Sequence, residues 1–182
     1  MRQVLLLRGI NVGSRNRIAM KELRAALEAD GLGDVRTYLQ SGNVVCDSDA
    51  APAELAERGR RLIAASFELD IPVIVRSRDE LAAIVERDPL REVASDPKRY
   101  LVGFLDAELE PATLASLSEL VAPQERLAAA RMELYSWHPD GVSRSKLWNA
   151  IAAGRLGASV TTRNWSTVTN LLAIASDQPP SS

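Results

Sequence analysis

The sequence predicts an α+β protein made of two halves that share one order of elements. Three observations support this prediction: short apolar runs alternate with helical patterns, turn signals separate paired strands, and the order β-α-β-β-α-β occurs twice. This is the ferredoxin-like order. We therefore expect two ferredoxin-like βαββαβ-type subdomains packed together, at residues 1–88 and 98–176, and a disordered tail at 177–182.

The first half contains clear helix and strand signals. Gly42 lies in a turn between two runs rich in β-formers, and Pro52 suits a first helical position. Ser77 and Glu80 have the spacing of a capping box, in which each side chain bonds the other's backbone N–H. We expect strands at 4–7, 35–39, 44–46 and 73–75, and helices at 19–29, from 52 and from 77.

The second half repeats these signals in the same order. Pro111 suits the start of a helix, and Asp140 with Gly141 indicates a turn. We expect strands at 100–105, 127–130, 132–137 and 159–161, and helices from 111, at 143–153 and at 166–175.

The composition excludes several classes of protein. With 46% hydrophobic and 25% charged residues in a chain of 182, the sequence is typical of a globular protein. A single cysteine, Cys46, excludes an internal disulfide framework, and together with a single histidine, His138, it excludes a four-ligand Cys/His zinc site. The apolar run at 4–7 is too short for a signal-peptide core or a membrane span, so we expect a cytoplasmic protein that does not bind membranes.

The net charge of −2 hides an uneven distribution of charge. Residues 1–21 carry five basic residues and residues 141–176 carry four, whereas all 24 acidic residues lie elsewhere. Basic segments without carboxylates attract anions more readily than metals or cations. The alternative is a solvated basic surface with no ligand.

Two polar loops of the first half are candidate binding segments. In the loop at 8–14, two glycines allow a nest of backbone N–H groups, and Arg8 adds charge, although the loop is not a P-loop. At 40–43, amide side chains flank a Ser-Gly turn and could bind a polar ligand. For both segments, the alternative is that glycine and asparagine serve only the turn itself.

Two helix starts of the second half place cations where the helix dipole opposes them. Ser143 is expected to open a helix with Lys146 at the position that Glu80 holds in the capping box. A cation there costs about 0.3–1 kcal/mol when exposed, and a bound phosphate, sulfate or carboxylate would offset that cost. Arg163 and Asn164 repeat the arrangement before the last helix. The alternative is a pair of solvated side chains whose cost is tolerated.

No motif indicates a particular reaction. The chain lacks a paired-carboxylate motif and a nucleophile elbow, and His138 is expected to be a solvated imidazole in a turn. Cys46 is expected to be a small core residue. The strands at 4–7 and 44–46 also lack the aromatic side chains with which an RNA-recognition sheet stacks on bases.

Taken together, the segments 7–13, 38–45, 143–147 and 162–168 resemble an uncharacterised bacterial family, domain of unknown function 1697. The resemblance covers nearly the whole chain and implies a two-subdomain α+β fold, but it implies no activity. It assigns no role to Tyr135 or His138, because residues 128–138 depart from the family pattern. It brings forward as candidate site residues Arg8, Asn11, Gln40, Ser41, Asn43, Ser143, Lys146, Arg163 and Asn164.

The leading hypothesis is a protein that binds a phosphate-bearing or other anionic small ligand in a cleft between its halves, with Lys146 and Arg163 as the principal cations. One alternative is a nucleic-acid-binding module, favoured by the basic segments. The other is a structural or interaction protein without a ligand. The sequence identifies no reaction, cofactor or oligomeric state.

Overall fold

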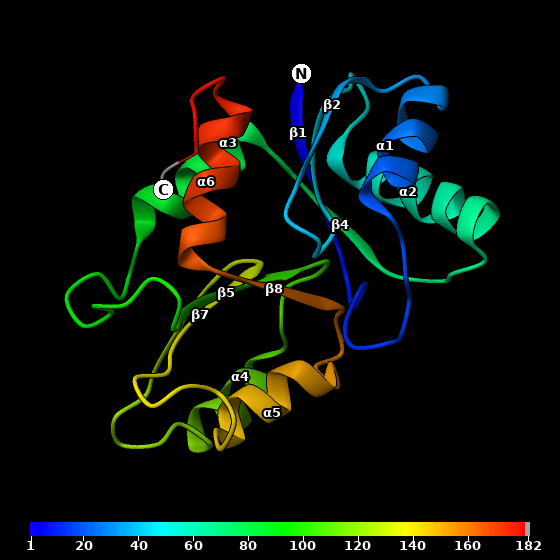
Figure 1. Ribbon diagram of the computed structural model, residues 1–182. Coiled ribbons are helices and arrows are strands. Elements are labelled where there is room, and N and C mark those ends of the chain that lie inside the picture. The colour runs from blue at the N-terminus through cyan, green and yellow to red at the C-terminus, as the bar shows by residue number, and fades with distance from the viewer. Residues whose placement is uncertain (181–182) are drawn as a thin grey trace. The chain divides into compact units, whose positions relative to one another are not determined.

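The computed structural model describes residues 1–180, which form two units, each with a four-stranded antiparallel sheet (Figure 1). The first unit comprises Met1–Ala83 and the residues from Thr169 on, and the second comprises Ile84–Val168. Both sheets follow a β-α-β-β-α-β order, so the predicted fold class is confirmed.

The first unit has the strand order β2-β3-β1-β4. Leu5 and Leu7 of β1 pack in one core with Leu23 and Leu55 from the two helices of this unit. Val4 and its neighbours on the opposite face are also buried, which explains the continuous apolar run. The elements are β1 (Arg2–Leu7), α1 (Met20–Ala29), β2 (Gly33–Tyr38), β3 (Asn43–Asp47), α2 (Pro52–Phe67) and β4 (Val73–Ser77).

The helix α3 (Arg78–Arg87) follows β4 and leads into the second unit. Its predicted capping box is confirmed: the Ser77 N–H donates to the Glu80 carboxylate at 2.7 Å, and the Glu80 N–H donates to the Ser77 hydroxyl at 3.2 Å. The predicted helix start at Pro52 is also confirmed, since α2 begins at this residue. Proline is suited to the first turn because an N–H there has no hydrogen-bond partner within the helix.

The second unit has the matching strand order β6-β7-β5-β8. Two of its helices, α4 and α5, lie side by side on one face of the sheet (Figure 1). Leu134 of the sheet packs with Leu147 and Ile151 of α5 in this core. The elements are β5 (Tyr100–Leu105), α4 (Pro111–Glu119), β6 (Arg126–Ala130), β7 (Glu133–Trp137), α5 (Lys146–Ala153), β8 (Val160–Asn164) and α6 (Trp165–Ala175), whose last residues belong to the first unit.

Two predicted boundaries in the second unit are wrong. The helix α5 begins at Lys146 rather than at Ser143, because the Ser145 hydroxyl caps it by accepting the Trp148 N–H at 3.0 Å. Lys146 is therefore the first helical residue and does not replace a capping-box glutamate. The strand β8 extends past its predicted end at 161, because it pairs with β5 as far as Asn164.

The predicted disordered tail falls partly on residues 181–182, which lie outside the described residues. Asp177 at the start of that tail forms ion pairs with Arg2 at 2.6 Å and Arg36 at 3.1 Å. Within residues 1–180, no helix combines the length and the apolar character that crossing a bilayer requires.

Candidate functional site

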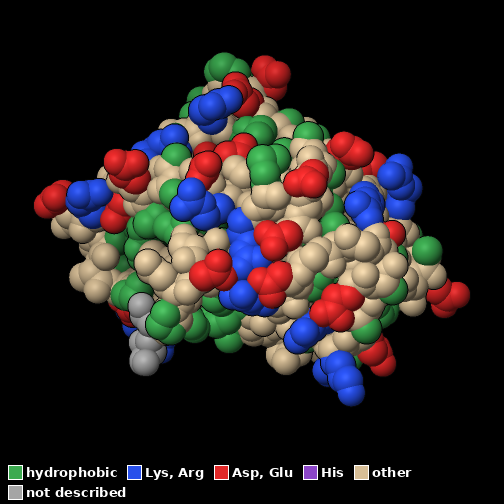
Figure 2. Space-filling view, turned by 90° about the horizontal axis from the view of Figure 1, so that it is seen from above, with side chains coloured by type: hydrophobic (Ala, Val, Ile, Leu, Met, Phe, Trp, Pro, Cys, Tyr) green, Lys and Arg blue, Asp and Glu red, His purple; other side chains and the backbone are tan. Residues whose placement is uncertain are grey.

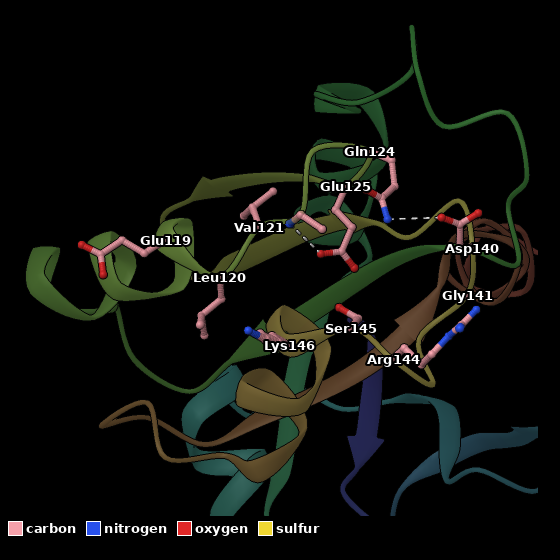
Figure 3. A pocket seen from close by; sticks show the side chains of 11 residues that line it. Glu119, Leu120, Val121, Gln124, Glu125, Asp140, Gly141, Arg144, Ser145 and Lys146 are labelled. Atoms are coloured by element: carbon pink, nitrogen blue, oxygen red, sulfur yellow. Dashed lines mark hydrogen bonds between the residues drawn. The ribbon is translucent and has the colours of Figure 1, made fainter.

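A pocket of about 450 Å³ opens at the N-terminus of α5 in the second unit (Figure 3). The segment after α4 forms one side, and the loop that leads from β7 into α5 forms the other. Lys146 is the only predicted site residue among those that line it. The lining consists of Glu119, Leu120, Val121, Ala122, Gln124, Glu125, Asp140, Gly141, Arg144, Ser145 and Lys146.

The two cations of this pocket, Arg144 and Lys146, are exposed and form no ion pair with another described residue. Arg144 and Lys146 lie on either side of Ser145, the residue that caps α5 (Figure 3). Neither side chain forms an ion pair with another described residue of the chain. Both therefore add positive charge beside the unpaired N–H groups of the first turn.

Elsewhere on the surface, charged side chains lie close to side chains of opposite charge. Arg2 lies within 3.2 Å of Asp34, Asp47 and Asp177, so these charges neutralise one another. On the face shown in Figure 2, basic and acidic side chains likewise alternate over short distances. The unpaired cations at the pocket contrast with this pattern.

A buried carboxylate, that of Glu125, lies in the middle of the pocket lining. Its side chain points toward the Ser145 hydroxyl (Figure 3) and is 4% exposed. The Ala122 N–H donates to Glu125 Oε2 at 3.1 Å. Burial by itself raises the pKa of Glu125, but hydrogen bonds from Ser145, His138 and the Ala122 N–H outweigh it and hold the pKa below its ordinary value.

The imidazole of His138 lies behind this carboxylate. Its Nδ1 is 2.8 Å from Glu125 Oε1, its Nε2 is 3.0 Å from the Ser136 hydroxyl, and its ring meets Trp148 edge-on. His138 is 0% exposed, so the prediction of a solvated imidazole is wrong. The sequence carried no signal for this pairing, because Glu125 and His138 are thirteen positions apart in the chain and only the tertiary fold brings them together.

The order Ser136, His138, Glu125 resembles that of a nucleophilic triad, but its chemistry differs. Ser136 is 3% exposed and pairs with both neighbouring strands, through Leu101 and Leu127. A hydroxyl buried in mid-sheet is out of reach of a substrate. The arrangement holds the Glu125 carboxylate in place, and among residues 1–180 no three histidine, cysteine, aspartate or glutamate side chains cluster as a metal site requires.

Three predicted residues of the first unit form hydrogen bonds within its loops. The Asn11 amide donates to the carbonyls of Ile18 at 2.9 Å and Gln40 at 2.8 Å, while its oxygen accepts the Ile18 N–H. The buried Asn43 amide donates to the Tyr38 carbonyl and to the Ser41 hydroxyl. These contacts brace the two loops against each other and close the β2–β3 turn.

The other two predicted residues of this unit have different surroundings. Arg8 is half-buried, and its backbone N–H donates to the Pro72 carbonyl at 3.0 Å. The Gln40 side chain is exposed.

Arg163 and Lys146 lie on opposite faces of the second sheet. Arg163 pairs with Val102 in register, and its guanidinium donates to the Thr161 hydroxyl on the same face. α5 packs on the other face, through Leu134, so the prediction that these two cations meet in one site is wrong. Burial lowers the pKa of Arg163 to about 10.

Asn164 and Ser143, the last two predicted residues, flank helices. The Asn164 side chain accepts the Thr167 N–H at 2.9 Å and so caps α6. Ser143 is exposed and lies three positions before the first residue of α5.

Comparisons with known proteins agree with the resemblance inferred from the motifs. A family model described as protein of unknown function (DUF1697) matches residues 1–135, so the segments around Lys146 and Arg163 lie beyond the matched part. The structure of the conserved bacterial protein SP0830 from Streptococcus pneumoniae is similar, with 25% identity, a TM-score of 0.79, and coverage of 96% of this chain and 98% of that one. No curated protein matches the chain.

Proposed function

Because the chain belongs to the DUF1697 family of proteins of unknown function, we propose its function from the pocket itself: it binds a small anionic ligand, such as a phosphate-bearing molecule, at the N-terminus of α5. The observation that carries this proposal is that two exposed cations, Arg144 and Lys146, line a pocket at a helix start without any ion pair in the described chain.

Arg144 and Lys146 form no ion pair with another described residue, so both are open to contact with an anion in the pocket. A lysine in a first helical turn is opposed by the helix dipole at a cost of about 0.3–1 kcal/mol. An anion in the pocket would contact the ammonium of Lys146, the guanidinium of Arg144 and the partial positive charge of the helix start. A volume of about 450 Å³ suits a small metabolite rather than a bare ion.

The test compares thermal unfolding in phosphate and in chloride at equal ionic strength. Phosphate is expected to raise the Tm of the wild type, whereas this gain should disappear in Lys146→Ala and Arg144→Ala. Lys98→Ala and Arg155→Ala are matched controls, because both residues are exposed in the same unit and line no part of the pocket. The controls also account for the non-specific stabilisation that excluded anions produce.

An equal gain in all variants would overturn the proposal. A nucleic-acid-binding role makes a different prediction, since oligonucleotide affinity would fall steeply with salt. Oligonucleotide binding that is unaffected by Lys146→Ala would favour that alternative.

A further inference from the structure

The pocket at α5 contains a fixed negative charge between its two cations. Glu125 lies in the centre of the lining, with Lys146 and Arg144 on either side of Ser145 below it (Figure 3). Glu119 and Asp140 add carboxylates at the exposed rim, and Asp140 accepts a hydrogen bond from Gln124. A ligand that is purely anionic would therefore meet repulsion from the lining as well as attraction.

The Glu125 carboxylate retains capacity to accept one more hydrogen bond. An ionised carboxylate offers about four acceptor positions. Two of them are used by His138 Nδ1 and the Ala122 N–H, and the Ser145 hydroxyl lies beside the carboxylate (Figure 3). The carboxylate therefore has at least one acceptor position left, and because Glu125 lines the pocket, a ligand can supply the donor.

The Glu125 carboxylate is fixed in position and remains ionised. Its two oxygens are held by groups from different segments, His138 after β7 and Ala122 after α4. These same hydrogen bonds hold its pKa below the ordinary value, so it stays charged at neutral pH. A fixed carboxylate of this kind selects against ligands that bring no donor.

We infer that the ligand of this pocket is a zwitterion, in which a protonated nitrogen donates to Glu125 while a nearby anionic group contacts Lys146 and Arg144. The inference rests on the proposed function, because it assumes that the pocket binds an anionic group. It specifies a second group on the ligand, an ammonium that lies a few bonds from the anionic group.

Two phosphate monoesters that differ only in the ammonium test this inference. 2-Aminoethyl phosphate and ethyl phosphate are titrated into the full chain by calorimetry at neutral pH and fixed ionic strength. The amine is expected to bind at least about tenfold more tightly, as a hydrogen bond between charged groups would provide. In Glu125→Gln this advantage should fall below about threefold, with the affinity for ethyl phosphate unchanged or improved.

Lys146→Ala is expected to weaken both probes by the same factor, whereas Asp140→Asn should leave the ratio of their affinities unchanged. If Glu125→Gln does not fold, choline phosphate replaces the variant: its nitrogen is charged but has no N–H to donate, so most of the advantage should be lost in the wild type.

The outcomes separate the two proposals. Equal affinity for the amine and ethyl phosphate in the wild type would overturn the zwitterion and leave the anion pocket standing. An advantage that persists in Glu125→Gln, or with choline phosphate, would also overturn it. Binding of neither probe would overturn the zwitterion together with the proposed function.

Discussion

His138 Nδ1 lies 2.8 Å from Glu125 Oε1, and both side chains are buried in the second unit. This pair joins the segment after α4 to the segment after β7, and it holds the carboxylate that lines the pocket. The stability of this unit and the geometry of its pocket therefore depend on the same contact.

Replacing His138 with leucine should destabilise the protein by about 2–5 kcal/mol, because a buried carboxylate loses a donor and the new side chain cannot replace it. Ser136→Ala removes only the outer hydrogen bond and should cost about 1 kcal/mol. Urea unfolding monitored by circular dichroism measures both. A His138→Leu variant as stable as Ser136→Ala would show that the pair contributes little.

The Glu125 carboxyl should make the protein sensitive to acid. Its folded pKa lies below the ordinary value of 4.5, so its contribution to stability is fully present above that pH and is lost as the pH falls through the folded pKa. The difference in unfolding free energy between wild type and Glu125→Gln should therefore shrink on acidification from about pH 6 to about pH 3. Taking the difference removes the contributions of other carboxylates with lowered pKa values, such as Asp34 and Asp70. A difference that is constant with pH would contradict this assignment.

Gly42→Ala should destabilise the first unit more than Gly9→Ala. Both residues have positive φ, +75° at Gly42 and +63° at Gly9, so each substitution carries the backbone cost of about 1–2 kcal/mol. A Cβ at Gly42 would also lie 2.6 Å from Leu7 Cβ and 2.8 Å from Ile10 Cδ1, whereas a Cβ at Gly9 meets nothing within 4 Å. We expect a total of about 2–4 kcal/mol for Gly42→Ala in urea unfolding. Equal losses for the two variants would show that the backbone conformation alone matters.

Cys46 should be unreactive in the native protein. Burial raises the pKa of its thiol to about 11, so about one thiol in a thousand is ionised at pH 8, and the side chain is 0% exposed. A thiol reagent is expected to label Cys46 only when the chain unfolds, and the labelling rate in dilute urea then reports the opening of the first unit. Rapid labelling of the native protein would contradict its place in the core.

The sequence by itself determined most of the local structure. Signals such as the Ser77 to Glu80 capping box, Pro52 at a helix start and the apolar run of β1 depend on neighbours within a few residues, so they could be read without the fold. The β-α-β-β-α-β order followed from those elements, and from it the fold class. Lys146, which the sequence singles out as a cation near a helix start, lines the pocket at α5.

Only the tertiary structure decided which polar side chains share a site. Arg163 lies on the face of the sheet opposite α5. Residues alternate between faces along a strand, and the pairing of β8 with β5 places Val160 on the α5 side and Arg163 on the other. Asn11 and Asn43 donate hydrogen bonds to backbone carbonyls of the first unit's loops, and His138 lies in the interior beside Glu125. Burial and hydrogen-bond partners depend on packing between segments distant along the chain, and no spacing in the sequence records that packing.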